Sequence, residues 1–121
     1  FKHKPMLLNL SNHPSATWPP GQLQAALQAY GQVEDLSFPQ VPPDADTDYV
    51  EQLAETYLHQ ILARRPAAVH LMGELTFCCR LVNKLKAAGI PALASTTARN
   101  VAYDENGNKI STFSFVRFRE Y

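Results

Sequence analysis

Residues 67–89 read AAVHLMGELTFCCRLVNKLKAAG. The apolar run 67–72 is typical of a strand buried in a sheet, and Gly73-Glu74 turns the chain out of it. Beyond the turn, four apolar side chains share one face of a helix: Cys78, Leu81, Val82 and Leu85. A buried strand that leads directly into a helix is the building unit of a parallel α/β sheet.

The same alternation of strand and helix continues on both sides of this unit. Strands are predicted at residues 6–11, 33–38, 67–72 and 90–94, with helices in the three intervals between them. The rest of the chain changes character. Two strand-like runs, 101–104 and 109–118, flank Asn106-Gly107, which is a strong signal for an antiparallel β-hairpin.

These elements predict a three-layer α/β fold with a Rossmann-like, mostly parallel sheet. Right-handed crossovers favour the strand order 2-1-3-4, with the C-terminal antiparallel hairpin extending the sheet beside the fourth strand. We expect one domain over residues 6–121, because the first apolar strand begins at Met6 and no linker or repeat follows. Residues 1–5 are then a leader, either upstream sequence or residues introduced for expression.

Composition narrows the classes of partner. The 121 residues are 45% hydrophobic and carry a formal net charge of zero, so no global charge attracts duplex nucleic acid or an anionic membrane. No apolar run is long enough to span a bilayer. Cys78 and Cys79 are the only cysteines and are adjacent, which excludes a disulfide framework and favours a cytoplasmic location.

The predicted topology selects the place for a ligand. In an open parallel sheet, ligands bind beyond the carboxyl ends of the strands, at the point where the strand order reverses. With the order 2-1-3-4, that point lies between the first and third strands. Three polar segments follow strands near it, at residues 11–15, 73–76 and 95–100.

The first segment carries hydrogen-bonding side chains and a titratable one. Ser11, Asn12 and Ser15 offer donors and acceptors for ribose, phosphate or base edges. His13 is a candidate proton carrier near neutral pH. The alternative is that these residues only satisfy the backbone of a turn, a position they favour in any protein. Trp18, a few residues on, suits either stacking on a base or covering the edge of the core.

The second segment opens a helix, whose free N–H groups and dipole attract anions. Gly73 would let a ligand approach the backbone, and Thr76 offers a hydroxyl. Glu74 is a candidate base or an acceptor for ribose hydroxyls, although its charge would repel phosphate. The alternative is that Glu74 and Thr76 only stabilise the helix N-terminus.

The third segment is the most suggestive of phosphate binding. Ser95, Thr96 and Thr97 place three hydroxyls in a row, and Arg99 adds a guanidinium fork. The alternative is that the threonines belong to a strand and that Arg99 is an edge charge. His70, inside a predicted strand, is interpreted as a packed core histidine. No His, Cys or carboxylate spacing indicates a metal site.

Several stretches of the chain resemble one family. The opening LLNLSNHP (7–14), the central VHLMGE (69–74), the segment ASTTAR (94–99) and the ending FVRFREY (115–121) resemble small CRISPR-associated proteins of type III systems. That family is related to CARF domains, the Rossmann-like sensors of cyclic oligoadenylates. Some proteins of this wider group are ring nucleases, which open the cyclic messenger and switch the antiviral response off.

The resemblance implies a cyclic oligoadenylate ligand, a homodimer that grips it across a two-fold axis, and no cofactor. It implies metal-independent cleavage, in which a ribose 2′-OH attacks phosphorus. Ser11, Asn12, Thr96, Thr97 and Arg99 would hold phosphates and riboses. We expect His13 or Glu74 to transfer the proton and Arg99 to stabilise charge.

Two other function classes are compatible with the sequence. One is a sensor or sponge of the same fold that binds the cyclic nucleotide without cleaving it. The other is a structural interaction protein that contacts a larger complex through Arg117 and Arg119, which alternate with apolar residues on the last strand.

Overall fold

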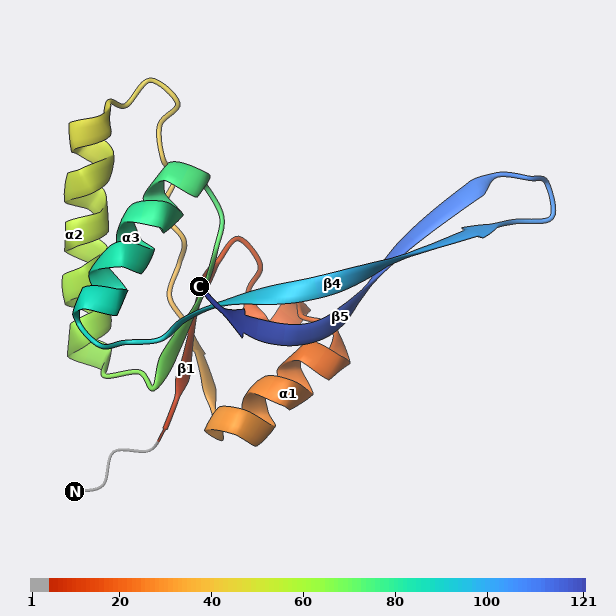
Figure 1. Cartoon of the computed structure of the whole chain (residues 1–121), viewed down its shortest axis with the longest axis horizontal. Helices are drawn as coiled ribbons and strands as arrows, with labels where there is room; N and C mark the ends of the chain where they lie inside the picture. Colours follow the sequence, from red (N-terminus) through yellow and green to blue (C-terminus); the bar gives the residue numbers. More distant parts are fainter. Residues whose placement is uncertain (1–4) are drawn as a thin grey trace.

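The computed structural model describes residues 5–121, drawn as a ribbon in Figure 1. Its helices are α1 (Pro20–Tyr30), α2 (Thr47–Arg64) and α3 (Leu75–Ala87), and a short 3-10 helix, η1, spans Ser15–Thr17. Its strands are β1 (Leu7–Ser11), β2 (Val33–Asp35), β3 (Ala68–Met72), β4 (Ala92–Tyr103) and β5 (Lys109–Glu120).

The five strands form one sheet in the order β2-β1-β3-β4-β5. All neighbours pair in parallel except β4 and β5, which are antiparallel. The predicted α/β class, the order 2-1-3-4 and the C-terminal hairpin are therefore confirmed. The predicted leader falls almost entirely on residues 1–4, which lie outside the described part of the chain.

The sheet separates two apolar clusters. Leu8 and Leu10 of β1 pack with residues of α2 and α3 on one face, whereas Leu7 packs with Trp18 and α1 on the other (Figure 1). Because successive side chains of a strand point to opposite faces, burial of both faces requires a continuous apolar run. All five residues of β1 are buried. Asn9 and Ser11 share the face of Leu7, where they are buried polar residues.

Two findings concern membrane-spanning helices and the state of the cysteines. Over residues 5–121, no helix is both long and apolar enough to cross a bilayer. Both thiols are free, and Cys79 is exposed while Cys78 is buried in the core beside α2 and the sheet.

The segment after the fourth predicted strand differs from the prediction. The sequence predicts a strand ending at residue 94, a loop over 95–100 and a new hairpin strand, but β4 runs unbroken over Ala92–Tyr103. The reason is that β5 offers a partner along this whole length, from Leu93 opposite Glu120 to Tyr103 opposite Lys109. One irregularity in the pairing, between Thr96 and Thr97, bends the ribbon.

The outer half of this ribbon forms an arm, defined here as residues 98–114, which projects from the body (Figure 1). Cross-strand partners share a face, so Arg99 and Phe113 lie together on one side and Ala98 and Ser114 on the other. Phe113 is 67% exposed and Tyr103 is 70% exposed. The arm therefore presents aromatic side chains that its own body does not cover.

Candidate functional site

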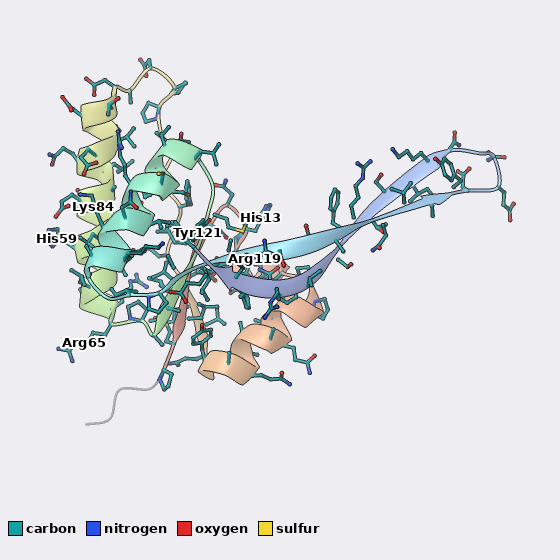
Figure 2. All side chains as sticks on the ribbon, viewed as in Figure 1. His13, His59, Arg65, Lys84, Arg119 and Tyr121 are labelled. Carbon is teal, nitrogen blue, oxygen red and sulfur yellow. The ribbon has the colours of Figure 1, made fainter. Side chains whose placement is uncertain are left out.

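A cleft of about 510 Å³ lies at the carboxyl ends of β1 and β3, where the strand order reverses. Its walls are built by the ends of β1 and β3 with the segments that follow them, by the start of α1 with the residues before it, and by the body half of β4. The lining residues are Ser11, Asn12, His13, Thr17, Trp18, Pro19, Gln22, His70, Met72, Gly73, Ser95 and Thr97. Figure 2 shows His13 near the place where β4 leaves the body.

A chain of hydrogen bonds crosses three strands beneath this cleft. The Nδ1 atom of His70 lies 2.9 Å from Oδ1 of Asn9, and Nε2 of His70 lies 3.1 Å from the Ser95 hydroxyl. Asn9 and His70 are paired in the β1–β3 register and are 1% and 2% exposed. Of these three hydrogen-bonded residues, Ser95 is the one that is partly exposed, at the surface of the cleft.

The partners of Asn9 decide which nitrogen of His70 carries the proton. The Asn9 amide nitrogen donates to the backbone oxygen of His13 and to Oδ1 of Asp35, both at 2.9 Å. Its carbonyl oxygen must then be the atom that faces His70, and an oxygen only accepts. His70 therefore donates from Nδ1, which leaves a lone pair on Nε2. The Ser95 hydroxyl donates to that lone pair.

The surroundings of His70 keep the ring neutral. The Trp18 and Phe118 rings stand edge-on to it, with centroids 5.1 and 5.6 Å away. Burial, helped by the nearby charge of His13, lowers the pKa of His70 to about 4. At neutral pH the imidazole is thus an uncharged proton acceptor with its free lone pair directed at Ser95.

The structure gathers six of the predicted site residues around the cleft: Ser11, Asn12, His13, Gly73, Ser95 and Thr97. Two others lie beside it with structural contacts. Ser15 donates through its amide and its hydroxyl to the Asp35 carboxylate, at 3.0 and 2.8 Å. The Thr96 hydroxyl donates to the backbone oxygen of Arg117 across the ribbon.

Glu74 and Thr76 follow the structural alternative. Glu74 is the N-cap of α3, and its carboxylate accepts from the amides of Thr76 at 3.0 Å and Phe77 at 2.8 Å. The Thr76 hydroxyl also donates to this carboxylate. These hydrogen bonds, that of the Thr76 hydroxyl first, lower the pKa of Glu74. Both oxygens of this carboxylate are engaged in capping the helix and Glu74 does not line the cleft, so the expected proton-transfer role does not suit its position.

Gly73 is needed for packing as well as for access. A Cβ at this position would overlap the ring of Phe38, which lies against the backbone of the turn. Phe38 in turn stacks edge-on with Phe77 of the core, at 5.3 Å between centroids. The absence of a side chain at Gly73 therefore makes room for the ring of Phe38 at least as much as for a ligand.

Arg99 lies away from the cleft, in the arm. Its guanidinium donates to the Ser111 hydroxyl at 3.1 Å. Over residues 5–121, the cleft lining contains no Lys or Arg side chain. Arg99, which the sequence predicts to lie beside a bound phosphate, is therefore not part of the cleft of its own chain.

Comparison with known proteins adds a family. The model of the uncharacterized protein MJ1673 family matches residues 5–119, almost the whole described chain. The chain belongs to this family. No curated protein matches it.

In this member of the MJ1673 family, sequence reasoning missed the role of two residues that shape the site. The sequence places Asn9 in an apolar strand and predicts that His70 is a packed core histidine. His70 is indeed packed, but it also forms the cleft floor. The available signal was the presence of two polar residues in strands otherwise fit for full burial.

The sequence is compatible with two roles for Trp18, and in the structure this residue lies both at the edge of the core and at the cleft. It packs with Leu7 and Ala26 and is 7% exposed, and it also walls the cleft. Its indole N–H donates to the backbone oxygen of His13 at 3.0 Å. This hydrogen bond fixes both the ring and the loop that carries His13.

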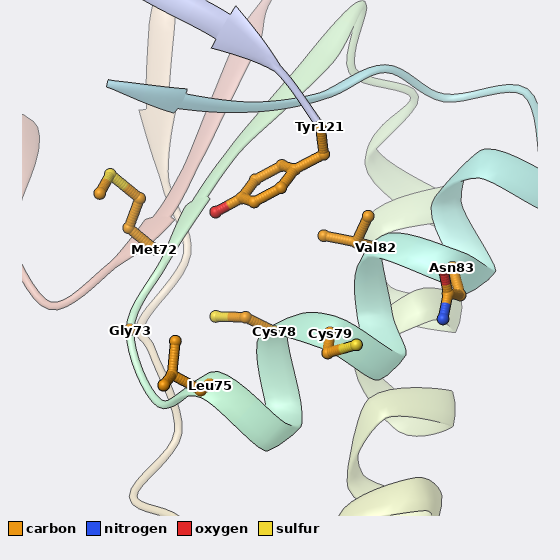
Figure 3. Close-up of a pocket in the computed structure, with 8 residues that line it drawn as sticks. All are labelled: Met72, Gly73, Leu75, Cys78, Cys79, Val82, Asn83 and Tyr121. Atoms are coloured by element: carbon orange, nitrogen blue, oxygen red, sulfur yellow. The ribbon is translucent and has the colours of Figure 1, made fainter. Parts of the chain in front are cut away.

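A second, apolar pocket of about 300 Å³ adjoins the cleft and shares Met72 and Gly73 with it (Figure 3). Tyr121 closes one side, and its hydroxyl donates to the backbone oxygen of Leu71 at 2.6 Å.

Among the described residues of this MJ1673-family protein, no group of three or more His, Cys, Asp or Glu side chains is placed to hold a metal ion.

Proposed function

We propose that this protein is a ring nuclease, which binds a cyclic oligoadenylate in the cleft and opens it to switch off type III CRISPR antiviral signalling. One observation carries the proposal: a single cleft combines an aromatic wall, a set of hydroxyl and amide groups, and an exposed imidazole. Trp18 suits a purine, Asn12 and Thr97 suit ribose and phosphate oxygens, and His13 suits proton transfer. The family resemblance of the sequence supports the same ligand.

The proposed reaction requires neither a metal nor a cofactor. The 2′-OH of one ribose attacks the neighbouring phosphorus as His13 takes its proton, and the bond to the 5′ oxygen breaks. The 5′ oxygen leaves with the proton that His13 has taken up, and the other product end is a cyclic 2′,3′-phosphate. His13 is the base in this scheme because Glu74 is engaged in capping α3.

A specific observation favours a second candidate, a sensor or sponge that binds the ring without cleaving it. Two of the three expected catalytic residues, Glu74 and Arg99, have structural partners outside the cleft. A cleft without a cation can hold a ligand through hydroxyls and stacking yet lack charge stabilisation for the transition state.

The ring assay separates these candidates. Cyclic oligoadenylates of several ring sizes are incubated with the protein in excess EDTA, and the products are separated by chromatography. We expect linear products with cyclic-phosphate ends, formed at least ~100-fold more slowly by His13→Ala. His59→Ala is the matched control, because His59 lies on the exposed side of α2, where it contacts Glu55. A retained, uncleaved ring would favour the sensor, and neither binding nor cleavage would reject both candidates.

We also propose that the protein acts as a cytoplasmic homodimer, and the arm suggests how two copies meet. Two aromatic side chains of the arm, Phe113 at 67% and Tyr103 at 70%, are exposed in the single chain. Isolated two-stranded ribbons are only marginally stable in water. A partner copy that covers the Arg99–Phe113 side of the arm would bury its aromatic rings and bring Arg99 near a shared polyanion. The exposed free thiol of Cys79 suits the reducing cytoplasm.

Light scattering after gel filtration tests this assembly. We expect a mass of twice the 13.5 kDa of one chain. Phe113→Lys should halve the measured mass, because it places a charge within the covered side of the arm. Ser114→Lys, on the opposite side of the same strand, should leave the mass unchanged. A wild-type mass of one chain, or equal effects of the two variants, would contradict the arm-mediated dimer.

A further inference from the structure

We propose that Ser95, His70 and Asn9 form a nucleophilic triad that hydrolyses small, uncharged carboxylic esters, an activity distinct from the cleavage of a cyclic nucleotide. In this triad Ser95 is the nucleophile, His70 is the general base, and Asn9 orients the base. The activity does not depend on the proposed function, since it needs neither a phosphate nor a ribose.

The contacts have the arrangement that nucleophilic catalysis requires. A hydroxyl lies within hydrogen-bond reach of an imidazole, and a third group holds the other ring nitrogen. Here the two distances are 3.1 Å from Ser95 Oγ to His70 Nε2 and 2.9 Å from His70 Nδ1 to Asn9 Oδ1. The three residues come from β4, β3 and β1, so rigid neighbouring strands fix their spacing.

Asn9 has no freedom to turn its amide round. Its nitrogen has two acceptors, the His13 backbone oxygen and Asp35, while its oxygen also accepts from the Ser11 hydroxyl at 2.8 Å. A reversed amide would place its oxygen 2.9 Å from two other acceptors, the His13 backbone oxygen and Asp35 Oδ1, with no proton between them. The tautomer of His70, with its lone pair toward Ser95, is therefore built into the β1–β3 pairing.

Ser95 is also partly exposed to the cleft, and its contact with the Met72 sulfur is weak enough for a substrate oxygen to replace it. Its hydroxyl and its backbone N–H both lie near the thioether sulfur of Met72, at 3.1 and 3.3 Å. A thioether is a weak acceptor, and a substrate oxygen would accept from that N–H more strongly. The N–H of the nucleophile is thus positioned to stabilise the negative charge that develops on the carbonyl oxygen.

The lining of the cleft indicates the substrate class. Trp18, Pro19 and Met72 supply apolar walls. Within residues 5–121 no Lys or Arg of the same chain lines the cleft, so a neutral substrate, unlike the anionic ring, needs no cation from a second copy. A cleft of about 510 Å³ is within the range of small-molecule sites. A neutral ester with a short apolar acyl group fits these features.

The reaction balances with water as the only co-substrate. Ser95 Oγ bonds to the carbonyl carbon while its proton passes to His70 Nε2, and the carbonyl oxygen becomes an oxyanion. Collapse breaks the bond to the alcohol oxygen, which leaves with the proton from His70. Water then attacks the acyl-serine and gives its proton to His70. The freed Ser95 oxygen recovers that proton as the carboxylic acid departs.

A biotinylated alkyl fluorophosphonate tests the nucleophile directly, because attack by Ser95 displaces fluoride and leaves the phosphorus bonded to Oγ. We expect stoichiometric labelling of the wild-type chain, located on Ser95 by peptide mass spectrometry. p-Nitrophenyl acetate should be hydrolysed by the same protein. Ser95→Ala and His70→Gln should slow its hydrolysis at least ~1000-fold.

The control is Ser37→Ala, which removes an exposed hydroxyl outside the cleft and should change neither readout. Folding of each variant is checked by circular dichroism, and the labelled position in the wild type requires no variant at all. Wild-type protein that is folded but unlabelled at Ser95 would overturn the triad. Labelling without ring cleavage would remove only the proposed ring nuclease, and ring cleavage without labelling would remove only the triad.

Discussion

The Asn9→Ala variant is expected to lose about 3 kcal/mol of its free energy of unfolding, well above the roughly 1 kcal/mol typical of point mutations. The amide of Asn9 is 1% exposed and contacts four groups: His70 Nδ1, the Ser11 hydroxyl, the His13 backbone oxygen and Asp35. Removing it leaves His70 Nδ1 buried without a partner and opens a cavity, and both changes destabilise the folded state.

Urea unfolding at pH 7.5 measures this loss, and a second asparagine provides the control. Asn100 lies on the exposed arm and donates a single hydrogen bond, to the Ser114 hydroxyl at 3.2 Å. Asn100→Ala should change the free energy of unfolding by less than about 0.5 kcal/mol. Equal losses in the two variants would show that the hydrogen-bonded chain beneath the cleft does not stabilise the fold.

The body of the fold was predictable because it depends on local patterns. A strand buried on both faces leaves a mostly apolar run, and β1 and β3 each have one in spite of Asn9 and His70. Their turns and helices follow within a few residues. The order of the strands then follows from the handedness of the crossovers, with no need for any side-chain detail.

The extent of β4 could not be predicted in the same way. The mostly polar segment 95–100 resembles a loop, because a strand with no core beneath it carries no apolar alternation. What makes this segment a strand is its pairing with β5, in which Ser95 lies opposite Phe118 and Asn100 lies opposite Thr112. These partners are 23 and 12 positions further along the chain. Contacts between residues so far apart in sequence leave no local pattern.

The distance of Arg99 from the cleft follows from the same strand. A strand advances by about 3.3 Å per residue, so Arg99 lies roughly 13 Å beyond Ser95 along the ribbon. In a loop, the two side chains could have met around one phosphate. In β4, Ser95 and Thr97 stay at the cleft while Arg99 is carried into the arm.

Acid should destabilise the protein through His70, and this is the second large effect. Its pKa is lowered from the ordinary 6.5 to about 4, chiefly by burial. Above pH 6.5 the ring is neutral in both the folded and the unfolded state. Between pH 6.5 and 4 the unfolded state binds a proton that the folded state does not, so stability falls as the pH falls. The expected loss is about 3 kcal/mol by pH 4, from the size of the pKa difference.

Urea unfolding at several pH values between 7.5 and 4 measures the effect, and His70→Gln isolates it. Glutamine can still donate toward Asn9 and accept from Ser95, but it has no proton to gain, so the curve of this variant should be flatter by about 3 kcal/mol. His59→Gln, on the exposed side of α2, should keep the wild-type slope. The ionisable neighbours His13 and Asp35 remain in every variant. If His70→Gln is as acid-sensitive as the wild type, carboxylates rather than the buried imidazole set the acid limit, and the neutral form of His70 that the triad requires loses its independent support.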